Sequence, residues 1–251
     1  MKSFLLKIKV INFFLGLFWY LILKKKFHNS KIKKINKIKY DDIFIVTSCT
    51  NPSDFNSYKN HNILHTSKIR LKELLETFNS IKSFYPNAYI INIENSKISR
   101  KDSVIIKKKV NKHLNYFDDD FIKLSRKHRN KGVPWLCKLI KFLNENNNNI
   151  NYKRLHFLAG RYCLLKSIKK KTDTGVYFKF YKKYHNVSSR YFYYNFVPVN
   201  DILNSLKKTL LISLKDYSVE DFIFKFQSAK VFFLKKVGVK GKVNGLQQIF
   251  E

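Results

Sequence analysis

Residues 67–96, SKIRLKELLETFNSIKSFYPNAYIINIENS, combine a helix pattern with a strand pattern. Ser67 is placed to cap the helix, and Pro86 follows its end. Residues 88–93, AYIINI, are then mainly apolar over the length of a strand and are followed by the polar residues 94–96. The helix has apolar residues at every third or fourth position, which is the pattern of one buried face: Ile69, Leu71, Leu74, Leu75, Phe78, Ile81 and Phe84.

A second buried strand precedes this helix. Residues 43–46, IFIV, are continuously apolar and are followed by Thr47 and Ser48, a pattern typical of a parallel strand covered on both faces. Strand, helix and strand of these lengths predict a βαβ unit with parallel strands. Ligands of such sheets bind beyond the carboxyl ends of the strands. We therefore expect Thr47, Ser48, Glu94 and Asn95 to lie at one rim and to contribute to a ligand site.

A third strand is expected at residues 156–159, HFLA, which lead directly into Gly160, Arg161 and Tyr162. Arg161 is either an exposed residue of a turn or a cation that faces an anion in a cleft. The remaining sequence predicts helices at 131–145, 199–211 and 218–229. It also predicts an exposed asparagine-rich loop at 144–151. An antiparallel hairpin is expected within 175–198, with its turn at 185–189. The sequence predicts an α/β fold in which a single domain, residues 40–251, has a mostly parallel central sheet flanked by helices.

The N-terminal segment, residues 1–39, differs from the rest of the chain. An apolar run from Val10 to Leu23 is preceded by Lys7 and Lys9 and followed by the polybasic stretch 24–39. The run is shorter than the roughly 20 residues of a spanning helix. It fits a helix that lies in the interface of an anionic membrane, or a short anchor with snorkelling lysines, on the cytoplasmic face. A buried N-terminal helix is the alternative.

The charge of the chain indicates an anionic partner. It has 50 Lys and Arg against 17 Asp and Glu, a formal net charge of +33. Such a positive field favours phospholipid, nucleic acid or a phosphorylated substrate. Cys49, Cys137 and Cys163 form no CxxC pair, which fits a reducing compartment. His61 and His65 are interpreted as polar loop residues. Neither a GxGxxG nor a Walker A sequence is present, which argues against dinucleotide and P-loop enzymes.

Five segments together resemble a group of bacterial and viral glycosyltransferase-like proteins with a GT-A type nucleotide-diphospho-sugar transferase fold. The segments are residues 70–96, 130–132 (NKG), 157–164 (FLAGRYCL), 218–224 (SVEDFIF) and 237–245 (VGVKGKVNG). The resemblance spans about residues 43–245, and Ala159 stands where the group has a serine. It implies an enzyme that moves a sugar from a nucleotide-diphosphate donor to a cell-surface glycan or a lipid-linked acceptor.

The leaving nucleoside diphosphate of such a donor develops negative charge that the enzyme must stabilise. Arg161 could supply this stabilisation, with Gly160 allowing close backbone approach and Tyr162 stacking or hydrogen bonding. Arg70, Asn130 and Lys131 could add contacts to the donor. For Arg70 and Lys131, a solvated surface charge is the alternative.

Two groups of acids are candidates for the remaining chemistry. The run Asp118-Asp119-Asp120 resembles the DxD motif with which many GT-A enzymes hold Mn²⁺ or Mg²⁺, and Asp118 and Asp120 are its expected ligands. Such a run also starts helices, with Asp120 as the cap. Glu220 and Asp221 are candidates for the general base, and Glu220 matches the acid of the resembling motif. The alternative is that they offset the dipole of a helix.

A non-specific binder of single-stranded nucleic acid is the competing functional class. The aromatic and cationic hairpin at 175–198 would provide its surface. A membrane-attached scaffold without catalysis is a third possibility. The spread of charge along the chain, the absence of a recognition motif and the apolar N-terminus favour the transferase.

Overall fold

The structure is a computed structural model that describes residues 2–30, 32–52, 55, 66–168, 172–236, 238–243 and 247–250. His61 and His65 lie outside these residues. The predicted βαβ unit is present: β1 (Ile38–Ser48) and β2 (Tyr89–Glu94) are parallel neighbours joined by α3 (Ser67–Phe84). Thr66 caps α3, because its side chain accepts a hydrogen bond from the Ile69 amide. The cap expected at Ser67 is therefore wrong by one residue.

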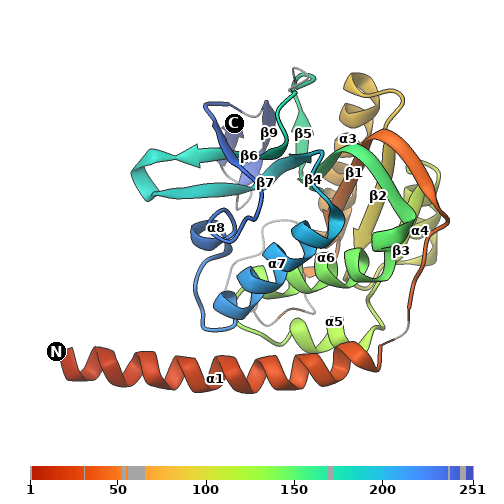
Figure 1. The fold of residues 1–251 in the computed structure, drawn as a ribbon. Helices are drawn as coiled ribbons and strands as arrows, with labels where there is room; N and C mark the ends of the chain where they lie inside the picture. The colour runs from red at the N-terminus through yellow and green to blue at the C-terminus, as the bar shows by residue number, and fades with distance from the viewer. Residues whose placement is uncertain are drawn as a thin grey trace.

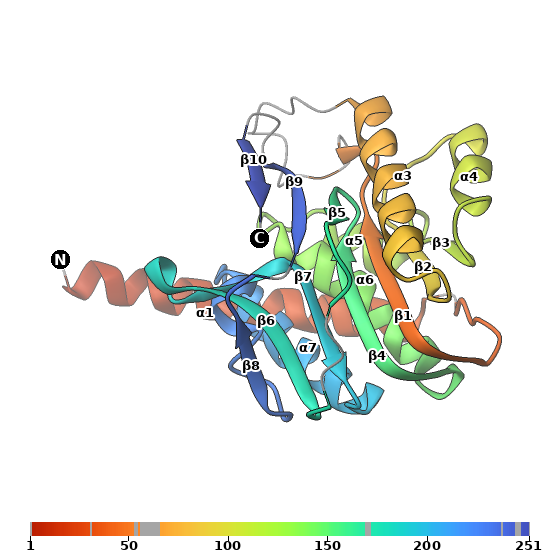
Figure 2. The same ribbon diagram turned by 90° about the horizontal axis from the view of Figure 1, so that it is seen from above.

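Within the described residues, the central sheet has seven strands in the order β3-β2-β1-β4-β7-β6-β8 (Figures 1 and 2). Among these strands only β7 runs against the others, so the mostly parallel sheet is confirmed. A smaller sheet joins β5, β9 and β10. The bounds are β3 (Lys112–Asn115), β4 (Ile150–Ala159), β5 (Tyr162–Leu164), β6 (Gly175–Tyr181), β7 (Asn186–Asn195), β8 (Val231–Leu234), β9 (Val239–Val243) and β10 (Gln247–Phe250).

Helices cover both faces of the central sheet. Side chains alternate along β1, so Ile43 and Ile45 pack on one face while Phe44 and Val46 pack on the other. The first face is covered by α5 (Asp120–Ser125), α6 (Gly132–Asn146) and α7 (Val199–Ser213). The second is covered by α3 and α4 (Arg100–Lys107). Burial on both faces explains the apolar runs of β1 (residues 43–46) and β4 (residues 157–159) and the apolar character of β2, which contains the buried Asn92.

Three predicted elements differ from the structure. The predicted helix at 218–229 is reduced to α8 (Val219–Phe222). The hairpin of β6 and β7 turns at residues 182–185, slightly earlier than expected. The asparagine-rich stretch 144–151 is not an exposed loop, because it belongs to the end of α6, a short 3-10 turn and the start of β4. The Asn146 side chain is buried, where it accepts from the Ile35 amide and donates to the Lys33 carbonyl.

The N-terminal segment forms a long helix, α1 (Lys2–His28), that lies across α5 and α7 (Figure 1). One face of α1 is packed on the domain: Leu23 is buried in the core, and Phe27 contacts Phe121 of α5 with ring centroids 5.0 Å apart. Gly16 lies against α7, where an added Cβ would come within 2.7 Å of the Lys215 side chain. No helix formed by the described residues combines the length and apolar character needed to span a bilayer.

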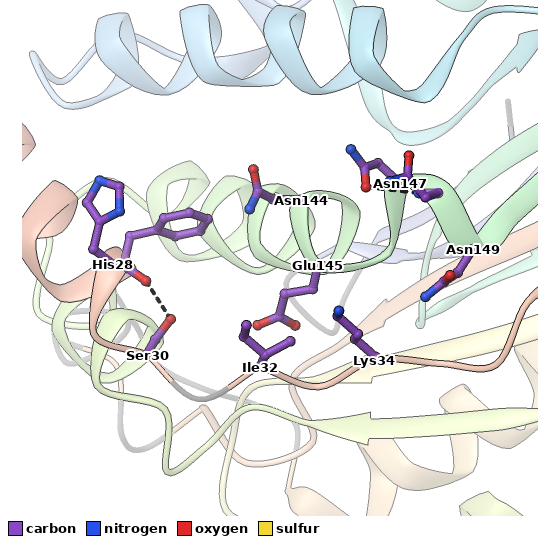
Figure 3. A pocket seen from close by; sticks show the side chains of 10 residues that line it. His28, Ser30, Ile32, Lys34, Asn144, Glu145, Asn147 and Asn149 are labelled. Atoms are coloured by element: carbon purple, nitrogen blue, oxygen red, sulfur yellow. Dashed lines mark hydrogen bonds between the residues drawn. The ribbon is translucent and has the colours of Figure 1, made fainter.

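The linker after α1 runs along α6 and contributes to the core. Ile35 and Ile38 are buried, and Ile38 begins β1, so the boundary expected at residues 39 and 40 falls inside that strand. Figure 3 shows the pocket between this linker and the end of α6, into which Glu145 reaches from the helix. The linker is therefore held by specific contacts with α6.

Candidate functional site

The carboxyl ends of three strands meet at one rim of the sheet. Thr47 of β1 pairs with Ile93 of β2 on one side and with Ala159 of β4 on the other. A cleft opens at this rim and encloses about 130 Å³. It is lined by Thr47, Ser48, Cys49, Thr50, Phe55, Arg70, Asn95, Lys131, Pro134, Trp135, Lys138, Ala159, Gly160 and Arg161. Of the residues expected around one cleft, Thr47, Ser48, Asn95 and Arg161 line it, whereas Glu94 does not.

Four cations from different parts of the chain line this cleft. Arg70 comes from α3, Lys131 directly precedes α6, Lys138 lies on α6, and Arg161 follows β4. None of the described lining residues carries a carboxylate. Burial and the neighbouring Arg161 cation lower the pKa of Lys131. The arrangement concentrates positive charge at one place and is suited to binding an anion.

Lys138 forms the floor of the cleft. Its side chain is 3% exposed, and its ammonium donates to the Ser48 carbonyl oxygen at 2.8 Å and to Asn95 Oδ1 at 3.2 Å. Burial lowers the pKa of Lys138 to about 8, although the negative charge of Glu94 opposes this shift. The amine is therefore mainly protonated at pH 7 and carries its charge at the base of the cleft.

Gly160 fixes the position of Arg161. The Gly160 amide donates to the Thr47 carbonyl at 2.8 Å, which extends the β1–β4 pairing to the end of the strand. An added Cβ at Gly160 would lie 2.6 Å from the Leu74 side chain and 3.2 Å from the Thr47 carbonyl oxygen. A larger residue here would require the Leu74 side chain of α3 to move, so glycine allows this close approach. Arg161, half-buried, then faces the cleft, which favours the second of its two interpretations.

The remaining walls are aromatic and polar. Trp135 donates from its indole nitrogen to Thr47 Oγ1 at 3.2 Å, and Arg70 donates to the Cys49 carbonyl at 3.0 Å. Burial raises the pKa of the Cys49 thiol to about 12, so the thiol stays protonated at neutral pH. These hydrogen bonds hold both side chains against the ends of β1.

Three residues expected to bind a donor lie outside the cleft lining. Glu94 is buried beneath the rim, where it accepts from the amides of Thr50, Asn95 and Ser96. Tyr162 is buried against β9, and its hydroxyl accepts from Arg190. Asn130 ties the start of α6 to the carbonyls of Ser213 and Tyr217. All three stabilise the surroundings of the cleft instead.

The acidic run before α5 does not form a metal site in the structure. Asp119 is the N-cap of α5, accepts from the Ile122 amide and forms an ion pair with Lys141, whereas Asp120 is exposed and lies 3.7 Å from Lys26. Asp118 is exposed. Across the described residues, no group of three or more His, Cys, Asp or Glu could hold a metal ion. The expected ligand pair of Asp118 and Asp120 therefore lacks further ligands, and the expected cap at Asp120 is Asp119.

Glu220 and Asp221 lie in the short helix α8, outside the cleft lining. Glu220 accepts hydrogen bonds from Ser189 at 2.5 Å and from Ser218 at 2.7 Å. The preceding residue, Val219, packs on Gly132, where an added Cβ would lie 2.2 Å from the Val219 side chain. Through this contact α8 adjoins the start of α6 and hence Lys131.

Sequence reasoning missed Trp135 and Lys138. Both follow Lys131 at helical spacing, i+4 and i+7, so the three residues share one face of α6. That spacing was the available signal, but it does not say which face of the helix meets the sheet rim. Most of the aromatic residues expected to form a surface on the hairpin are not available to stack bases, because Tyr177, Phe178 and residues 191–194 are at most 2% exposed, although Tyr184 and Phe196 are exposed.

No protein-family model and no curated protein sequence matches this chain. Among solved structures, the galactosyltransferase LgtC, in complex with donor and acceptor sugar analogues, is 10% identical, with a TM-score of 0.47 over 76% of this chain and 72% of LgtC. The bifunctional glycosyltransferase WbbM is 9% identical, with a TM-score of 0.45 over 80% of this chain and 40% of WbbM. The mannosyltransferase PcManGT from Pyrobaculum calidifontis, in complex with GDP-Man and Mn²⁺, is 8% identical, with a TM-score of 0.41 over 92% of this chain and 66% of PcManGT. Similarity at this level carries no argument about the activity of this chain.

Proposed function

We propose that the chain is a glycosyltransferase that binds a nucleotide-diphospho-sugar in the cleft at the carboxyl ends of β1, β2 and β4. The observation that supports this is the convergence of Arg70, Lys131, Lys138 and Arg161 on one cleft with no described carboxylate in its lining. The cleft is smaller than the pockets of about 300–1,000 Å³ that hold whole small-molecule ligands. The described residues thus enclose room for an anionic group such as a diphosphate.

In the proposed reaction the bond between the sugar C1 and the diphosphate oxygen breaks, and its electron pair stays on the diphosphate. The acceptor hydroxyl oxygen forms the new bond to C1 and loses its proton to a base. Cations fixed beside the leaving diphosphate stabilise the charge that develops there. Glu220 and Asp221 remain the candidates for the base, because α8 adjoins the start of α6. The acceptor is proposed to be a glycan or a lipid-linked saccharide.

Arg161→Ala is expected to weaken nucleoside diphosphate binding by about ten- to a hundredfold, the effect of losing a charge-assisted pair of roughly 1.5–3 kcal/mol. Isothermal titration of wild type and variant with the nucleotide that best stabilises the protein measures this loss. Arg161→Lys should restore only part of the affinity, since an ammonium lacks the planar fork of a guanidinium. The melting temperature should change little, because Arg161 is half-buried and contributes no core packing.

If Arg161→Ala binds every nucleoside diphosphate as wild type does, Arg161 is only a residue of a turn and the donor site is misplaced. Single-stranded oligonucleotides, titrated in parallel, address the competing functional class. Tight oligonucleotide binding combined with no response to any nucleotide sugar would favour that class over the transferase.

We further propose that α1 lies in the interface of an anionic membrane. Its outward face carries apolar side chains, of which Phe14 is 63% and Phe18 is 59% exposed, opposite the face that packs on the domain. Residues Ile11, Leu15 and Leu21 extend this stripe, and Lys24, Lys25 and Lys26 follow it. An apolar stripe next to cations is the pattern of a helix embedded at the surface of anionic lipid.

The full chain is expected to sediment with vesicles of mixed neutral and anionic phospholipid. Binding should weaken at high salt without being lost, because apolar burial persists when charge is screened. Replacing Phe14 and Phe18 with Gln should reduce binding at least about tenfold, since each ring contributes roughly 1.5–3 kcal/mol when buried. Tyr184→Gln, an exposed aromatic on the β6–β7 hairpin, is the control. Protein that remains in the supernatant at low salt would contradict the proposal.

A further inference from the structure

Two buried lysines of α6 differ in how their charge is balanced. Lys141 lies 3.0 Å from Asp119 and 2.7 Å from Glu145. Lys138, three residues earlier, donates hydrogen bonds to the neutral acceptors Ser48 O and Asn95 Oδ1, and the charge of the buried Glu94 acts on it without a direct ion pair. Among the described residues, no carboxylate lies within ion-pair distance of Lys138. A buried charge is costly unless an opposite charge balances it, so Lys138 is placed to receive an anion from outside the chain.

The side chains that line the cleft are unsuited to binding a divalent metal ion. Mg²⁺ and Mn²⁺ prefer carboxylate and other oxygen ligands, and the described lining offers no carboxylate and no imidazole. Cys49 lines the cleft, but a thiol must be deprotonated to bind a metal, and the raised pKa of Cys49 keeps its proton. Arg70, Lys131 and Arg161 would repel a divalent cation. The donor set fits an anion and does not fit a metal.

We propose that this cleft balances the diphosphate charge of its donor with protein cations, chiefly Lys138 and Arg161, and needs no divalent metal ion. The inference rests on the proposed function, because it takes the anion to be the diphosphate of a nucleotide sugar. An ammonium has three N–H donors, and two of those of Lys138 already orient it through the rim, which leaves the third for a phosphate oxygen. The guanidinium of Arg161 offers paired donors to the same group.

The test is isothermal titration of the full chain with inorganic pyrophosphate and with nucleoside diphosphates, first in EDTA and then with MgCl₂ or MnCl₂. The dissociation constant in EDTA is expected to stay within about threefold of the value with metal, and Lys138→Met should raise it at least about tenfold by removing a charge-assisted pair. Arg161→Gln, which changes a half-buried residue, should also raise the dissociation constant. Lys153→Met, an exposed cation at the opposite end of β4, is the control and should bind as wild type.

The outcomes separate this inference from the proposed function. Nucleoside diphosphate binding that appears only with metal and ignores Lys138→Met would overturn the inference and leave a transferase with a metal elsewhere. Metal-independent pyrophosphate binding that depends on Lys138, without release of nucleoside diphosphate from any nucleotide sugar, would support the anion site and overturn the transferase. No binding under either condition would overturn both. If Lys138→Met fails to fold, Arg161→Gln decides alone.

Discussion

Replacing Asp42 with asparagine is expected to lower the free energy of unfolding by about 3–5 kcal/mol, the usual cost of breaking a buried ion pair. Asp42 accepts two hydrogen bonds from Arg154, at 2.5 and 2.6 Å, and one from His156 at 2.9 Å. His156 is fully buried, its ring stacked on Phe44 at 4.1 Å. Burial lowers the pKa of His156, so the neutral ring donates from Nε2 to Asp42 and accepts from Tyr191 at Nδ1.

Asp41→Asn is the matched control, because it changes the adjacent residue of β1. The side chain of Asp41 is 65% exposed and pairs with the exposed Lys153, so its loss should cost less than about 1 kcal/mol. Urea unfolding of both variants at pH 7 measures the difference. Equal stability of Asp42→Asn and Asp41→Asn would show that the cluster of Asp42, Arg154 and His156 contributes nothing beyond a surface pair.

The same cluster predicts a pH dependence. Burial alone would raise the pKa of Asp42, but the hydrogen bonds from His156 and Arg154 outweigh burial and lower it from 3.8 to about 2. The carboxylate therefore contributes stability above pH 4, about 2 kcal/mol, and this is lost as the pH falls toward 2. Asp42→Asn lacks this contribution. The difference in free energy of unfolding between wild type and Asp42→Asn should therefore become smaller between pH 5 and pH 3. A constant gap would contradict the assignment.

Much of the fold was predictable because each central strand is covered on both faces. Complete burial produces the apolar run of β1 and the mainly apolar sequences of β2 and the end of β4, in which Asn92 and His156 are also buried, and such patterns are visible without a structure. Once the strands were predicted to be parallel, their carboxyl ends placed Thr47, Asn95 and Arg161 at one rim. The rule locates the site but does not say which helix closes it.

The rest depended on long-range packing that local patterns do not encode. In the sequence, Lys138 is one of several lysines in an amphipathic helix. It lies at the base of the cleft only because α6 packs against the central sheet. The linker offers a similar case: Lys33 and Ile35 belong to a polybasic stretch whose sequence gives no sign of a partner, yet Asn146 binds the backbone of both. The sequence predicts a loop at 144–151 for the same reason, since the partner of Asn146, the Ile35 amide, lies 111 residues earlier.

The contacts between that linker and α6 centre on Lys141, and its loss is the second large effect expected. Lys141→Met should lower the free energy of unfolding by about 3–5 kcal/mol, because it leaves two buried carboxylates without their cation. Asp119 and Glu145 are 1% and 5% exposed, and Lys141 also donates to Ser30 of the linker at 2.7 Å. Figure 3 shows Glu145 on α6 facing the linker that carries Ile32 and Lys34. Thermal and urea unfolding measure the loss.

Adding Asp119→Asn and Glu145→Gln to Lys141→Met should recover most of that stability, because the destabilisation comes from two buried carboxylates that have lost Lys141, and only the half-buried charge of Lys33 then remains beside them. Asn still caps α5 through its side-chain oxygen, and Gln still accepts from the Tyr116 hydroxyl. Lys138→Met is the control on the same helix: Lys138 forms no ion pair with a described carboxylate, so its loss should cost about 1–3 kcal/mol, the usual penalty for leaving buried acceptors unsatisfied. If Lys138→Met proves as destabilising as Lys141→Met, the two buried amines are equivalent structural charges, and Lys138 is not reserved for a ligand.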